Sequence, residues 1–306
     1  MNLEHINCPF CNSDSHRIID TLDGYNIVKC KTCGFKFTNP RPYISDLPDF
    51  YDEEYYKDER FLLQYYNKDG TINTNETDFD AGIVLIENYV SARGSVLEIG
   101  CATGIFLKQL KKRGWKTFGI EISTSACNIA KELNKIDVFC GSLKDFDSPV
   151  SFDVIIMQQT LEHLPDPKFV LQKASEILNH DGILVISVPN IKSFDIKISK
   201  SRKRNSYDLP RHLSHFDHNF LKKQLHDLGF DILEIDLYYP KFILTIVNFI
   251  NSKRKTKKHL NNIEPIKSDT NFPELLKYKI SLKGKLLKKI SNIFPGWKFT
   301  IIAKKK

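Results

Sequence analysis

The chain has 306 residues, of which 41% are hydrophobic and 27% are charged, a balance typical of folded globular proteins. This length suits one large domain of about 200 residues with a small appendage. The amino end has no apolar run with a cleavage site, and no run of about 18 apolar residues occurs. These patterns argue against a secreted or membrane-spanning chain and predict a cytoplasmic protein.

The net charge of +8 gathers near the carboxyl end, because residues 240–306 hold 17 Lys and Arg against 3 Asp and Glu. A basic segment of this kind predicts an anionic partner. We expect an insertion over 240–296, with three interpretations open for its basic stretch 240–290. It could touch an anionic membrane or a lipid-linked acceptor from the periphery, bind nucleic-acid phosphates, or form a lysine-rich lid exposed to solvent.

Two pairs of cysteines near the start each have the spacing C-x-x-C. Four thiolates in two such pairs suit a tetrahedral zinc site, and residues 1–42 are too few to fold on hydrophobic burial alone. We therefore predict a zinc ribbon over 1–42 whose Zn²⁺ is structural, because four cysteine ligands leave no open position for catalysis. The predicted ligands are Cys8, Cys11, Cys30 and Cys33. Three other cysteines are expected to be small buried apolar side chains: Cys101, Cys127 and Cys140.

Residues 43–94 are predicted to form a helical lead-in to the main domain. The run FYDEEYY occupies 50–56, and apolar residues recur at helical spacing within 79–92. Its tyrosines either pack the lead-in against the main domain or close over bound ligands as a lid: Tyr51, Tyr55 and Tyr56.

Strand and helix patterns alternate from residue 95 onward, which favours a parallel sheet with crossover helices. The run VLEIG is followed by a helix over 105–113 that Gly114 ends, then by the strand TFGIEI. Asp217 is the expected N-cap of a later helix. Further strands are expected near Val138 and over 152–157, 183–188, 230–239 and 299–303.

The turn after VLEIG has the small residues that let a backbone approach a ligand at a helix N-terminus. It is one residue shorter than a dinucleotide fingerprint and begins with an acid, Glu98. This layout suits an amino-acid moiety, with Glu98 holding the ammonium directly or through water and the turn holding the carboxylate. Glu121 ends the next strand, where an acid can accept hydrogen bonds from ribose hydroxyls.

These segments resemble class I S-adenosylmethionine-dependent methyltransferases. VLEIGCATGIFLKQLKKRGWKTFGIEIS is similar to the first two motifs of that family, and FDVIIMQQTLEHLPDPKFVLQKASEILNHDGILVISVPN to the later ones. LPRHLSHFDHNFLKKQLHDLGF is similar to a segment of ubiquinone-biosynthesis-like and glycan methyltransferases, and the cysteine pairs to a zinc-ribbon branch. The resemblance implies an α/β, doubly wound, Rossmann-like domain over 95–306 with seven mostly parallel strands.

The resemblance also implies S-adenosyl-L-methionine as cofactor, S-adenosyl-L-homocysteine as product, and a set of cofactor-binding residues. Ala102 replaces the usual middle glycine, which is tolerated if its backbone is not left-handed. Ser142 stands where the family often has an aspartate, so the adenine amino group has a weaker contact or a backbone one. The set is Glu98, Gly100, Ala102, Gly104, Glu121, Ile122, Ser142, Gln159 and Leu161.

The acceptor is expected to be a small molecule or glycan, such as a sugar nucleotide, a lipid-linked sugar or a quinol-like compound, methylated on oxygen or carbon. A hydroxyl or carbon nucleophile needs a base, and histidine titrates near neutral pH. The candidates are His163, His212 and His215. Two alternatives remain open: an RNA methyltransferase that uses the ribbon and basic insertion, and a cofactor-binding scaffold without an acceptor site.

Overall fold

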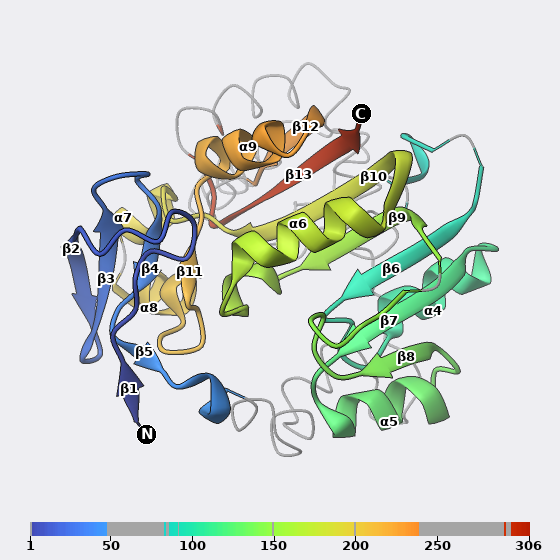
Figure 1. Ribbon diagram of the computed structural model, residues 1–306, viewed down its shortest axis with the longest axis horizontal. Helices are drawn as coiled ribbons and strands as arrows, with labels where there is room; N and C mark the ends of the chain where they lie inside the picture. The colour runs from blue at the N-terminus through green and yellow to red at the C-terminus, as the bar shows by residue number, and fades with distance from the viewer. Residues whose placement is uncertain are drawn as a thin grey trace, which may run out of the picture.

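The computed structural model is built around a seven-stranded sheet that lies beside a smaller four-stranded one (Figure 1). The structure describes residues 2–47, 86–90, 92–148, 150–198, 200–238 and 295–306, together with residues 83 and 291. Most of the predicted lead-in, with its three tyrosines, and nearly all of the basic insertion therefore lie outside the described residues. The boundaries proposed at residues 42 and 94 stay predictions.

The large sheet has the strand order β12-β13-β10-β9-β6-β7-β8. Strand β13 is antiparallel to both β10 and β12, and the pairs from β10 to β8 are parallel. The seven-stranded, mostly parallel fold is thus confirmed. Strand order reverses beside β6, and in open α/β sheets ligands bind outside the carboxyl ends of the strands at such a point. The strands are β6 (Ser95–Ile99), β7 (Lys116–Glu121), β8 (Asp137–Cys140), β9 (Phe152–Gln158), β10 (Leu178–Pro189), β12 (Phe230–Leu237) and β13 (Lys298–Lys305).

Helices cover both faces of this sheet, as the sequence pattern requires. Alternate residues of β9 point to opposite faces: Ile155 packs with α6 and α9, while Ile156 packs with α4 and α5. Three of the four helices begin at a side chain that accepts from a backbone N–H of the first turn: Ser123 on α5, Asp166 on α6 and the expected Asp217 on α9. Helix α4 begins at Gly104, which provides no side-chain cap. The helices are α4 (Ile105–Lys112), α5 (Thr124–Glu132), α6 (Pro167–Ile177) and α9 (His218–Asp227).

The small sheet stands beyond the carboxyl ends of the large sheet's strands (Figure 1). Three of its strands come from the amino end: β2 (His16–Leu22), β3 (Tyr25–Cys30) and β4 (Lys36–Thr38). The fourth, β11 (Ser214–His215), belongs to the segment before α9 and pairs antiparallel with β4. A separate two-stranded pair joins β1 (Leu3–Glu4) to β5 (Arg41–Pro42), and the 3₁₀ turn η1 covers Ile44–Asp46.

Two features of the fold differ from the sequence-based expectations. The segment before α9 was expected to be a loop, but it contains β11 and follows two short helices, α7 (Phe194–Ile198) and α8 (Lys200–Tyr207). Cys127 and Cys140 were expected to be isolated small apolar side chains, but a disulfide between them joins α5 to β8. Only Cys101 of the three is a free buried thiol. In the described part of the chain, we find no helix with the length and apolarity needed to cross a membrane.

Candidate active site

The turn between β6 and α4 has a left-handed backbone at three of its residues. Gly100 has φ 74° and Gly104, the N-cap of α4, has φ 71°. A Cβ on Gly100 would overlap the side chain of Thr160, so this position requires glycine. From the sequence, alanine is expected to be tolerated at position 102 only if the backbone there is not left-handed. Ala102 has φ 47°, which is left-handed, so its methyl group adds strain. A left-handed conformation at a residue with a Cβ costs about 1 kcal/mol.

Glu121 stabilises this turn from the end of β7. The carboxylate is buried and accepts a hydrogen bond from the Ala102 N–H at 2.9 Å and another from the Ser123 N–H at 2.9 Å. Each carboxylate oxygen can accept more than one hydrogen bond, which makes a carboxylate at this strand end a suitable group for ribose hydroxyls. Ile122 follows directly and is 48% exposed, which gives this edge of the sheet an apolar surface that suits a planar base.

Glu98 lies on β6 with 4% of its surface exposed. Its Oε1 accepts from Gln158 Nε2 at 3.3 Å, while its Oε2 is buried with no hydrogen-bond partner among the described residues. Burial raises the pKa of this carboxyl to about 8, and the charge of Glu121 adds to the rise. A buried polar atom without a partner costs free energy, so Glu98 is well placed to bind a cationic group.

Gln159 follows β9 with φ 51° and also has a buried polar atom. Its Nε2 finds no hydrogen-bond partner in the described part of the chain. Ser142 follows Gly141, whose N–H donates to the Glu121 carbonyl at 2.9 Å, so the turn after β8 adjoins the end of β7. The Leu161 side chain is fully buried in the hydrophobic core. The roles of these residues as cofactor ligands stay predictions.

His163 and His212 lie together beyond the end of β9. Their ring centroids are 4.7 Å apart; His163 ends the 3₁₀ turn η3 (Leu161–His163). His163 Nδ1 donates to the Arg211 carbonyl at 3.1 Å, and His212 Nδ1 to the Ser206 carbonyl at 3.1 Å. Because a carbonyl only accepts, these bonds place each proton on Nδ1 and leave Nε2 as the basic nitrogen. The pKa of each ring is lowered to about 3, mainly by burial. At His163 the neighbouring imidazole of His212 contributes to this lowering.

Glu162 joins this pair, although the sequence reasoning passed over it. It is 1% exposed, and neither carboxylate oxygen has a hydrogen-bond partner within the described ranges. Burial raises the pKa of Glu162 to about 8, with a contribution from Asp208. Glu162, His163 and His212 each place one ligand atom within 4.8 Å of the others, so this cluster could hold a metal ion or accept a proton. The sequence clue to Glu162 is that this acid stands directly before His163 in the run LEHLPDP.

His215, the third predicted base, points elsewhere. Its Nε2 lies 3.0 Å from Thr38 Oγ1 on the small sheet, and its ring lies 5.5 Å from that of Tyr207. Burial lowers its pKa to about 3, with a contribution from Lys36. The structure thus brings His163 and His212 together and places His215 in the contact with the small sheet.

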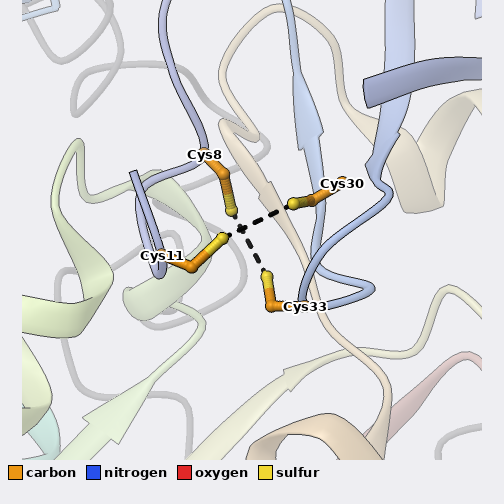
Figure 2. Close-up of side chains that lie close together, drawn as sticks. All are labelled: Cys8, Cys11, Cys30 and Cys33. Carbon is orange, nitrogen blue, oxygen red and sulfur yellow. Dashed lines mark hydrogen bonds between the residues drawn. The ribbon is translucent and has the colours of Figure 1, made fainter. Parts of the chain in front are cut away.

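The four paired cysteines converge from two knuckles (Figure 2). All four sulfur atoms lie within 4.8 Å of one another, with Cys8 to Cys33 and Cys11 to Cys30 at 3.5 Å. Zn–S bonds of about 2.3 Å in a tetrahedron place the sulfurs about 3.8 Å apart, so the donor set fits zinc. Although burial opposes it, backbone N–H groups of Cys33 and Thr32 lower the pKa of Cys30 to about 6, whereas burial raises the pKa of Cys8 and of Cys33.

Strand order reverses at β6, a left-handed turn of small residues follows β6, and an acid ends β7. These features are typical of a Rossmann-like protein that binds a cofactor containing a nucleoside. More specifically, the chain belongs to the methyltransferase domain family, whose model matches residues 76–235. The predicted class I S-adenosylmethionine-dependent methyltransferase is thereby confirmed.

Two curated relatives are ubiquinone biosynthesis O-methyltransferases. That of Colwellia psychrerythraea is 30% identical over 118 residues, which cover 35% of this chain and 48% of the relative. That of Idiomarina loihiensis is 25% identical over 153 residues, covering 46% and 63%. The chain therefore spans about half the length of the curated relatives it matches.

Solved structures share the fold at low sequence identity. A SAM-dependent methyltransferase from Archaeoglobus fulgidus has a TM-score of 0.52 and 21% identity, covering 83% of this chain and all of its own. Magnesium protoporphyrin IX methyltransferase from Synechocystis, with bound SAH, has a TM-score of 0.52 and 14% identity, covering 86% and 99%.

Proposed function

We propose that this chain transfers a methyl group from S-adenosyl-L-methionine to a hydroxyl oxygen of a small-molecule acceptor. The observation that carries the proposal is the buried Glu98, whose Oε2 has no partner among the described residues, beside a left-handed turn that Glu121 stabilises. The names of the curated relatives support oxygen as the methylated atom. The proposal covers a sugar nucleotide, a lipid-linked sugar or a quinol as acceptor, and carbon methylation is the alternative to it.

The residues present fit this cofactor. Glu98 would bind the ammonium, the N–H groups of the turn and of α4 the carboxylate, and Glu121 the ribose hydroxyls. Ile122 and the turn at Ser142 would flank the adenine. When bound, the cofactor supplies a methyl group that its sulfonium already makes electrophilic. The protein therefore has to align the acceptor and accept its proton.

On the acceptor side, Glu162, His163 and His212 are the described groups that could take a hydroxyl proton. Both imidazoles keep their Nε2 unprotonated, and both oxygens of Glu162 lack a partner in the described part of the chain. The four-cysteine site would hold a structural zinc ion, because its four thiolates complete a tetrahedral set.

An RNA acceptor gains no support from the described residues. Lys36, one of three basic residues near the metal knuckles, forms a 2.8 Å ion pair with the buried Asp217, so its charge is already neutralised. The basic stretch 240–290, on which contact with RNA or a membrane depends, lies outside the described residues. A peripheral membrane contact therefore stays a prediction.

Calorimetric titration of the full chain with S-adenosyl-L-homocysteine tests the cofactor half. We expect binding, at least about tenfold weaker in Glu121→Ala, since hydrogen bonds to a charged group contribute about 1.5–3 kcal/mol. Glu132→Ala, at an exposed acid that ends α5, is the matched control. Absence of binding at about 1 mM ligand would contradict the proposal. Transfer of labelled methyl to a catechol or a sugar nucleotide then distinguishes the acceptor classes.

A further inference from the structure

The small sheet is connected to the segment that carries His212. Strand β11 pairs with β4 in the register Ser214 to Phe37 and His215 to Lys36. The pairing continues beyond the strand, because the Thr38 N–H donates to the Leu213 carbonyl at 3.0 Å. The four-cysteine ribbon and the acceptor-side segment therefore share one hydrogen-bonded sheet.

Thr38 makes two polar side-chain contacts at this junction. It is fully buried, and its Oγ1 donates to the His212 carbonyl at 2.8 Å. A hydroxyl has one proton to donate, so its 3.0 Å contact with His215 Nε2 must be a bond that the imidazole donates. One hydroxyl thus fixes both the backbone of His212 and the tautomer of His215.

The same stretch of backbone holds the acceptor-side cluster from its other side. The Leu213 N–H donates to the Glu162 carbonyl at 2.8 Å, and the Arg211 carbonyl accepts from His163 Nδ1 at 3.1 Å. Residues 211–213 therefore lie between the ribbon and η3, and they are hydrogen-bonded to both.

Residues beside the four paired cysteines also contact the segment that follows Leu213, through aromatic rings and one ion pair. Phe10 lies between Cys8 and Cys11 in the sequence, and its ring centroid is 4.9 Å from that of Phe220. Phe35 lies 5.4 Å from Phe216. Lys36 pairs with Asp217, the N-cap of α9. Loss of metal from the cysteines would therefore release aromatic side chains that hold residues 211–217 in place.

We propose that Thr38 is a positioning residue through which the metal-loaded ribbon sets the geometry of the His163–His212 pair, leaving the cofactor half independent. The inference rests on the proposed function only in assigning that pair to the acceptor side. The hydrogen bonds of Thr38 to described residues outside its own sheet strands go to residues 212, 213 and 215, and not to the β6 turn or Glu121.

Hydrogen–deuterium exchange of the full chain, read by mass spectrometry, tests this coupling. In Thr38→Val, which keeps the side-chain shape, exchange of residues 206–217 should accelerate about fivefold, while residues 95–126 stay unchanged and zinc content remains one equivalent. Thr21→Val, at an exposed hydroxyl of the same small sheet that bonds Asn26, is the control. Equal exchange in the two variants would overturn the proposal.

Two further measurements exclude a merely structural role and a folding failure. The ¹⁵N resonances of the His215 ring should move in Thr38→Val and return in Thr38→Ser, which restores the hydroxyl. Chelation of zinc from the wild-type chain should accelerate exchange of 206–217 together with 25–38. If residues 206–217 stay protected from exchange after residues 25–38 have begun to exchange rapidly, the coupling is refuted.

Titration with S-adenosyl-L-homocysteine separates this inference from the proposed function. We expect Thr38→Val and the chelated chain to bind with an affinity within about twofold of the wild type. Such a change is smaller than the loss of one hydrogen bond to the ligand would cause. Loss of affinity in either would refute the independence of the cofactor half. If the wild type fails to bind, the proposed function fails, and the exchange and ¹⁵N results still decide the role of Thr38.

Discussion

Replacing Glu98 with Gln should separate stability from cofactor binding. Burial raises the pKa of Glu98 from 4.5 to about 8, so the folded chain holds a proton that the unfolded chain releases between these pH values. Stability that is complete below pH 4.5 is therefore lost as pH rises toward 8. At about 1.36 kcal/mol for each pH unit, the loss reaches about 3 kcal/mol at pH 7 and roughly 5 kcal/mol above pH 8.

Glu98→Gln removes this dependence because its amide does not ionise. The variant should match the wild type near pH 5 and exceed its free energy of unfolding at pH 9, by at most roughly 5 kcal/mol. Denaturant unfolding at both pH values measures the difference, and Glu132→Gln controls for loss of an exposed acid. Parallel pH profiles for wild type and Glu98→Gln would refute the assignment of a raised pKa to Glu98.

Affinity for the cofactor should change with pH in the opposite direction to stability, rising as the pH rises. An ammonium beside Glu98 favours the carboxylate, so binding below pH 8 releases a proton, and affinity for S-adenosyl-L-homocysteine should rise up to about tenfold per pH unit between pH 5.5 and 7. Calorimetry in buffers of different ionisation enthalpy detects that proton. In Glu98→Gln we expect weaker binding without proton release. Unchanged affinity in the variant would mean that Glu98 does not contact the ammonium.

Three other substitutions test separate parts of the structure. Ala102→Gly removes a Cβ from a residue with φ 47° and should stabilise the chain by about 1 kcal/mol; an unchanged or lower melting temperature would contradict a left-handed backbone. Cys30→Ser should lose its zinc, as measured by metal analysis, whereas retention of a full equivalent would rule out the four-cysteine site. Glu162→Gln should keep affinity for S-adenosyl-L-homocysteine and lower methyl transfer at least about tenfold; unimpaired transfer would exclude Glu162 as the proton acceptor.

Local signals in the sequence were enough to predict the main sheet and to propose residues for the cofactor half. Buried strands of four to eight residues, helices with Ser123 and Asp217 as caps, and acids at two strand ends are patterns within short windows. The two C-x-x-C pairs predicted a metal site because ligand spacing within each knuckle is also local. These features can be read without knowledge of the fold, and the structure shows Glu121 bonded to the β6 turn and Glu98 bonded to Gln158.

Only the tertiary structure shows which distant residues come together in the proposed acceptor half. Thr38 and His212 are 174 residues apart in sequence, and β11 has two residues, too few for a period that a sequence pattern could reveal. The burial of Glu162, the approach of His163 to His212 and the left-handed backbone at Ala102 likewise arise from packing between distant segments. The sequence by itself determined the two cysteine knuckles and the strand ends, because those depend on neighbours along the chain. The joining of ribbon to active site depends on neighbours in space.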